Sequence, residues 1–203
     1  MSKEKSMMLR NGEILDLDRP KPEVFDADTI AIALSRCCRW NNQTTIFYSV
    51  AQHSIMVKDA VQFAGGDKLD QMVALLHDAG EGFINDGSRP LKKKIPQLVE
   101  VEDSILDAIM KQFLDIGLND IPRSTWNLVK MADEQILMLE STVLFPRQYC
   151  PIDTSGLVEP FKNWGNMIIE CDFIHAKKQF VSNFYLLQNH ALKIAAKIHT
   201  RKK

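Results

Sequence analysis

Apolar residues recur at intervals of three and four positions over most of the chain, which is the spacing of one face of an α-helix. The pattern predicts an all-α protein whose first 27 residues are irregular, apart from a short strand near 14–17. Asp28 is the predicted N-cap of the first helix, and Ser49 with Gln52 predicts a capping box on the second. The predicted helices span about 29–39, 50–64, 68–78, 97–113, 122–144 and 167–198, and a long loop is predicted at 146–160.

Polar residues with ligand chemistry interrupt this apolar pattern in three places. His77 and Asp78 follow directly on the apolar run 72–76, and His53 shares a helix face with apolar neighbours. Asp133 breaks an otherwise apolar stretch of the helix predicted at 122–144. Burying a charged carboxylate beside an imidazole is costly unless the groups are hydrogen-bonded or hold a metal. These residues therefore need partners in the core.

One divalent cation would satisfy all of these residues together. Taken singly, His53 is more often a hydrogen-bonded core histidine than a ligand, and Asp133 is as often an ion-pair partner of Lys130 or Arg123. Two imidazoles and two carboxylates from three helices form a mixed nitrogen and oxygen set, which favours Co, Mn, Zn, Fe or Ni over Ca. The expected metal ligands are His53, His77, Asp78 and Asp133.

Composition narrows the class of protein. A length of 203 residues suits one well-buried core, and 45% hydrophobic with 25% charged residues is typical of a soluble globular protein. The formal net charge of -1 gives no sign of a nucleic acid polymer or a membrane surface as partner. The apolar runs are too short to span a bilayer, no signal-peptide core is seen, and the four cysteines show no CxxC spacing. We expect a cytoplasmic protein.

Four segments carry a resemblance to a known family: LSRCCRWN, FYSVAQHS, ALLHDAGEGFINDGSRPLK and KMADEQILMLE. Together they resemble the HD-domain metal-dependent phosphohydrolases, and within them the subgroup of 5'-deoxynucleotidases and phage dATP triphosphohydrolases. The resemblance covers residues 12–145. It implies a single HD domain over 1–203, with an HD core at about 28–145 and a C-terminal helical extension at about 167–198. It also implies a homo-oligomer, located in the host cytoplasm if the chain is phage-encoded.

Two further carboxylates are expected to be catalytic. A metal lowers the pKa of a water from about 16 toward 7 and polarises a phosphoryl oxygen. Glu81 follows the His77–Asp78 pair by one turn, so it can orient or deprotonate that water without binding the metal. Asp86 can share this task or protonate the leaving oxygen, and the resemblance implies that both residues are catalytic. The alternative for Glu81 is a solvated carboxylate at a helix end.

A phosphorylated substrate needs cationic partners. Arg39 offers a planar fork for phosphate, and the resemblance adds Lys92 and Lys130 as phosphate ligands, with Trp40 and Pro90 as walls of a nucleobase pocket. The expected reaction converts a deoxynucleoside triphosphate, dATP first, to deoxynucleoside and triphosphate. One alternative is a 5'-deoxynucleotidase acting on monophosphates. The other is a non-catalytic, nucleotide-binding regulatory HD module.

Overall fold

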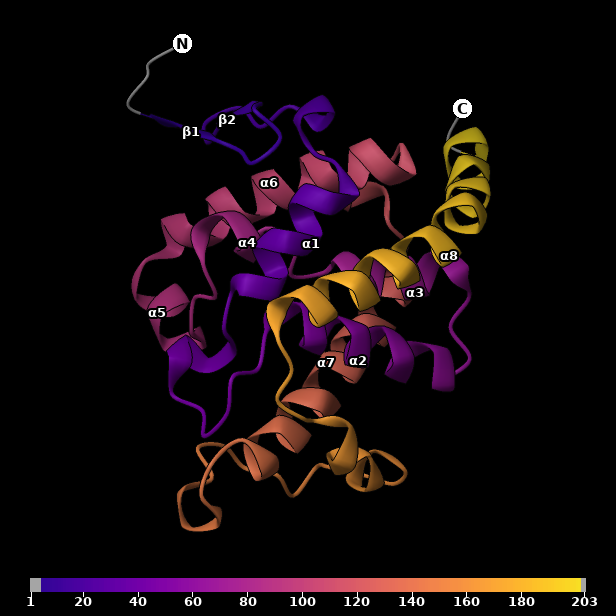
Figure 1. Ribbon diagram of the computed structural model, residues 1–203. Coiled ribbons are helices and arrows are strands. Elements are labelled where there is room, and N and C mark those ends of the chain that lie inside the picture. The colour runs from indigo at the N-terminus through magenta and orange to yellow at the C-terminus, as the bar shows by residue number, and fades with distance from the viewer. Residues whose placement is uncertain (1–4, 202–203) are drawn as a thin grey trace.

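The computed structural model describes residues 5–201, most of which lie in helices (Figure 1). The all-α prediction is confirmed. A short hairpin opens the chain, with β1 at Ser6–Met8 antiparallel to β2 at Ile14–Asp16. The α-helices are α1 (Ala27–Arg36), α2 (Val50–Phe63), α3 (Lys68–Leu76), α4 (Glu81–Ile84), α5 (Arg89–Lys94), α6 (Pro96–Leu114), α7 (Arg123–Val143) and α8 (Phe173–Arg201).

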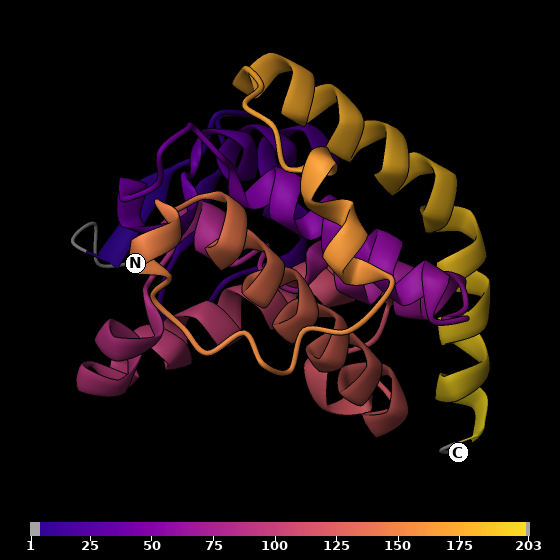
Figure 2. The same cartoon turned by 90° about the horizontal axis from the view of Figure 1, so that it is seen from below.

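The short helix α3 lies at the centre of the core. Its last five residues, 72–76, are all completely buried, and a helix that is apolar on every side belongs in the interior. Helix α2 packs along α3, α7 packs against α2, and α8 covers α3 and α1. Figure 2 shows α8 running along the outer side of this group, and in this view from below the 144–172 segment crosses in front of α7. The end of α3 is thus enclosed by several helices.

Several helix ends differ from the sequence prediction for local reasons. The N-cap of α1 is Asp26, whose carboxylate accepts from the backbone of Thr29 at 2.7 Å, whereas Asp28 pairs with Arg10 and Lys177. Helix α1 ends at Arg36 because a separate 3-10 turn, Arg39–Asn42, follows it. The capping box of Ser49 and Gln52 on α2 is confirmed.

The other differences concern the two ends of the chain. The predicted strand pairs with β1, which the hydrophobic pattern missed. The last helix begins at Phe173 instead of 167, after a 3-10 segment at Phe161–Met167. Among the helices of residues 5–201, none has the length and apolar character that a bilayer span requires. The division into an HD core and a C-terminal extension stays a prediction.

A tight turn at 77–80 joins α3 to α4 and carries the first candidate residues. The backbone N–H of Ala79 donates to the Leu76 carbonyl, and that of Glu81 to the Asp78 carbonyl. A Cβ added at Gly80 would lie 2.9 Å from the backbone oxygen of Glu102 on α6. Only glycine permits this approach, which brings the start of α4 against α6.

Candidate metal centre and adjoining cavity

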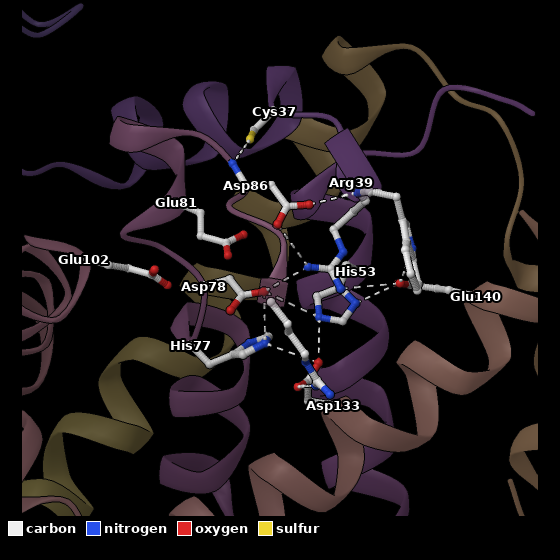
Figure 3. Close-up of polar contacts among 12 residues, drawn as sticks. Cys37, Arg39, His53, His77, Asp78, Glu81, Asp86, Glu102, Asp133 and Glu140 are labelled. Carbon is white, nitrogen blue, oxygen red and sulfur yellow. Dashed lines mark hydrogen bonds and ion pairs between the residues drawn. The ribbon is translucent and has the colours of Figure 1, made fainter. Parts of the chain in front are cut away.

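The four predicted metal ligands converge at one point (Figure 3). His53 comes from the start of α2, His77 and Asp78 from the turn that directly follows α3, and Asp133 from the middle of α7. Nε2 of His53 lies 3.1 Å from Asp133 Oδ1 and 3.6 Å from Asp78 Oδ2. Nε2 of His77 lies 3.3 Å from Asp78 Oδ2 and 4.0 Å from Asp133 Oδ1. The consecutive helices α2 and α3 and the later helix α7 thus bring one cluster together.

Both imidazoles are held so that Nε2 is the free nitrogen. Nδ1 of His53 donates to Glu140 Oε1 at 2.7 Å, and Nδ1 of His77 donates to the carbonyl of Ala74 at 2.8 Å. Metal-ligating histidines usually donate their other N–H to a carboxylate or a backbone carbonyl in this way. Both Nε2 atoms are buried without a hydrogen-bond partner. Once it has lost its proton, each Nε2 can offer a lone pair to a cation.

The spacing of these atoms fits a transition metal. Two ligand atoms about 2.1 Å from one cation lie roughly 3.0 Å apart at a right angle and roughly 3.4 Å apart at the tetrahedral angle. The four distances across the cluster, 3.1–4.0 Å, cover this range with slight excess. Ligand atoms of His53, His77 and Asp133 all lie within 4.8 Å of one another. The residues present fit a divalent metal with mixed nitrogen and oxygen ligands.

Without a metal, protons on the two imidazoles balance the negative charge of the carboxylates. Burial and Arg39 lower the pKa of His53, but Glu140 and Asp133 outweigh them, and the pKa rises to about 10. Burial opposes ionisation of Asp78, yet the neighbouring histidines hold its pKa far below the usual range. The cluster therefore keeps its carboxylates charged and gathers positive charge. A metal that binds there must displace protons from the imidazoles.

Glu81 lies beside this cluster in an acidic pocket closed by a lysine. Its side chain is 3% exposed, and Oε1 accepts from Lys92 Nζ at 2.8 Å while Oε2 is buried without a partner. Lys92 Nζ also lies 2.6 Å from Glu102 Oε2. Burial, followed by the charges of Asp78 and Asp86, raises the pKa of Glu81 well above its ordinary value. Glu81 is thus a buried carboxyl and not a solvated helix-end group.

Arg39 and Asp86 form the opposite side of the site. The Arg39 guanidinium lies 3.4 Å from Asp78, 3.9 Å from Asp86 and 3.5 Å from Glu140. Asp86 accepts from the backbone N–H of Trp40 at 2.9 Å, and its own N–H donates to Cys37 Sγ at 3.2 Å. Arg39 is therefore already neutralised by carboxylates, and Asp86 is fixed against the turn that carries Trp40.

The sequence reasoning did not select Glu102 or Glu140. Glu140 is completely buried and holds His53, and Glu102 holds Lys92 from α6. A Glu140 seven residues after Asp133 lies on the same helix face, which is the signal that would have found it. Glu102 stands in an acidic stretch, VEVEDS, which resembles a solvated face in the sequence.

A cavity of about 770 Å³ opens on this cluster. Among the predicted residues it is lined by Arg39, Trp40, Asp78, Glu81, Asp86, Pro90, Lys92 and Asp133. Lys130 is exposed and is not among the residues that line the cavity, so its role as a phosphate ligand stays a prediction. Arg89, 3.5 Å from Asp133, lines the cavity and was not predicted.

Comparison with known proteins places the chain among relatives from bacteria. No model of a known protein family matches it. It is 36% identical over 104 residues to YfdR of Escherichia coli, described as uncharacterized, and the match covers 50% of the chain and 54% of YfdR. It is 35% identical over 137 residues to a Rhodobacter capsulatus protein, also described as uncharacterized, across 64% of the chain and 68% of that protein. The chain therefore belongs to the same family as the Rhodobacter capsulatus protein.

Proposed function

We propose that the protein is a metal-dependent phosphohydrolase of the HD-domain type that acts on a deoxynucleotide. The first candidate reaction converts dATP to deoxyadenosine and triphosphate. One observation carries the proposal: two buried imidazole nitrogens without hydrogen-bond partners lie 3.1–4.0 Å from two carboxylates, and both carboxylates line a cavity together with the buried Glu81. This combination provides a cation site and a proton-transfer group beside one space for a substrate.

His53, His77, Asp78 and Asp133 would hold the cation, and Glu81 would exchange the proton. When bound, the cation would supply Lewis acidity toward a phosphoryl oxygen and lower the pKa of a water. Burial and the neighbouring carboxylates raise the pKa of Glu81, which makes its carboxylate a better proton acceptor. Asp86 lines the same cavity and is held by Trp40, so it can assist by orienting the water or the leaving oxygen.

The cavity supports a nucleotide as the substrate. Its volume of about 770 Å³ lies within the range of small-molecule sites. Trp40 and Pro90 form apolar walls on which a base can lie, and Lys92, Arg89 and Arg39 bring positive charge to the same space. Phosphate would lie at the cation and the base against the tryptophan.

A 5'-deoxynucleotidase acting on monophosphates is the second candidate. It is favoured by the exposed position of Lys130 and by the carboxylates that already pair with Arg39 and Lys92. Fewer free cations then face the phosphate chain than a triphosphate would engage. The two reactions differ in the product released from a common site.

One assay separates these possibilities. The protein is loaded with Mn²⁺, Co²⁺ or Zn²⁺ and incubated with each deoxynucleoside triphosphate and monophosphate, and the products are resolved by anion-exchange chromatography. Triphosphate release supports the first candidate, and orthophosphate from monophosphates alone supports the second. If nucleotides bind but none is hydrolysed with any of the three metals, the proposed enzyme activity is wrong. The protein is then a regulatory nucleotide-binding module. Light scattering on the same sample tests the expected homo-oligomer.

A further inference from the structure

Glu140 is a buried carboxylate that the proposed reaction does not use directly. It lies two turns after Asp133 on α7, and its side chain is completely shielded from solvent. Residues seven positions apart share one face of an α-helix. The same face of α7 therefore presents a candidate metal ligand and then Glu140.

The two carboxylate oxygens of Glu140 hold two different parts of the site. Oε1 accepts a hydrogen bond from Nδ1 of His53 at 2.7 Å. Oε2 accepts from the indole Nε1 of Trp40 at 3.2 Å and from a guanidinium nitrogen of Arg39 at 3.5 Å. In Figure 3, Glu140 lies beside the His53 ring, on the side away from His77. One buried side chain thus contacts a candidate metal ligand and the wall of the cavity.

The Arg39–Asn42 turn needs such support because its backbone is strained. Trp40, Asn41 and Asn42 have φ values of 57°, 50° and 62°. L-residues other than glycine rarely adopt this left-handed region, and a run of them persists only when surrounding contacts hold it. Asp86 binds the backbone of Trp40, and the Trp40 ring packs edge-on against Phe145. Glu140 adds the link from this turn to His53.

We propose that Glu140 is a positioning residue that couples the metal centre to the Trp40 wall of the cavity. Cation binding at His53 and the placement of the wall then depend on each other. The coupling rests on the metal centre of the proposed function and adds a residue that binds neither metal nor substrate. Because such linkage is reciprocal, removing the bond from Trp40 to Glu140 weakens cation binding, although Trp40 supplies no ligand.

A double-mutant cycle on metal affinity tests the coupling. Isothermal titration with Mn²⁺, without nucleotide, is carried out on the wild type, Glu140→Gln, Trp40→Phe and the double variant. Glu140→Gln should weaken Mn²⁺ binding about 10- to 100-fold, as the loss of an outer partner of a metal-ligating histidine does. Trp40→Phe keeps an aromatic ring but lacks the indole donor, and should weaken binding about 2- to 30-fold. In the double variant the Trp40→Phe effect should vanish, because it acts through Glu140.

The matched control is Glu100→Gln, which makes the same charge change at an exposed position of α6 that does not line the cavity. Its Mn²⁺ affinity should stay within about twofold of the wild type. Wild-type affinity in Glu140→Gln, or losses that simply add in the double variant, would overturn the coupling and leave the metal centre standing. Failure of the wild type to bind Mn²⁺ would overturn both. If Glu140→Gln does not fold, Trp40→Phe decides: weaker binding supports the coupling, and unchanged binding rejects it.

Discussion

The two sides of the cavity are built by different physical means. On the metal side, His53 and Glu140 are completely buried, and helices α2, α3 and α7 contribute to one apolar core. On the opposite side, α5 has no buried residue and meets the site through the charged side chains of Arg89 and Lys92. Apolar packing fixes the first side, and charge pairing holds the second. The metal ligands therefore lie on the side fixed by packing, while Arg89 and Lys92 reach the cavity from the side held by charge.

The largest expected effect comes from removing a ligand on the side fixed by packing. Asp133→Ala removes the carboxylate that lies 3.1 Å from Nε2 of His53 and 4.0 Å from Nε2 of His77. Loss of an outer partner already costs about 10- to 100-fold in metal affinity, so loss of a ligand should cost more and abolish turnover. Metal content measured by atomic absorption after dialysis checks this. Full occupancy in Asp133→Ala would refute the four-ligand site, and Glu100→Ala, at an exposed position of α6 outside the cavity, should retain its metal.

The next largest effect separates chemistry from metal binding. Glu81→Gln keeps the shape of the side chain but cannot exchange a proton, so the turnover number should fall about 10²- to 10⁴-fold. Metal content should not change, because Glu81 is not one of the four ligands. Turnover and metal content are measured on one preparation. Normal turnover would remove Glu81 from the mechanism, and lost metal would make it a ligand.

A smaller effect is expected when each of the two lysines predicted as phosphate ligands is replaced. Lys92→Met removes a cation that lines the cavity, and should lower kcat/KM about 10- to 150-fold, the value of one charge-assisted hydrogen bond of about 1.5–3 kcal/mol. Lys130→Met makes the same change at an exposed residue and should lower it less than about twofold. Steady-state kinetics on the substrate found in the product assay decides between them. Equal losses would place Lys130 at the phosphate after all.

The smallest effect is a pH dependence confined to the metal-free protein. The pKa of His53 rises from 6.5 to about 10 in the folded protein. A raised folded pKa contributes stability below pH 6.5 that is lost as pH rises toward 10. The melting temperature in chelator should therefore fall by at least about 3 °C between pH 6.5 and 9. With saturating Mn²⁺ the cation takes the place of the protons, and circular dichroism melts should show a flatter profile. A metal-free melting temperature that rises over this window would contradict the assignment.

Part of the site could be predicted from the sequence, and part of it could not. His53 and Asp133 were identifiable because a polar side chain on an apolar helix face must find a partner, and this requirement is visible in the pattern. The left-handed Arg39–Asn42 turn was missed, although two consecutive asparagines favour that conformation. Glu140 was missed although it shares a helix face with Asp133, because this spacing does not show that its partner is His53, 87 residues away.

Because ion pairs hold α5 against the site, the position of α5 should depend on the salt concentration. Ion pairs at partly exposed positions weaken as salt rises, because mobile ions screen charges beyond roughly 10 Å at 0.1 M, whereas apolar packing does not respond in this way. Arg89, whose side chain is 63% exposed, pairs with Asp133 in the reach of such ions. Ionic strength therefore acts on one wall of the cavity and spares the other. A polyanionic nucleotide carries its own charge to that wall, so it competes there with the same carboxylates that hold α5 in place.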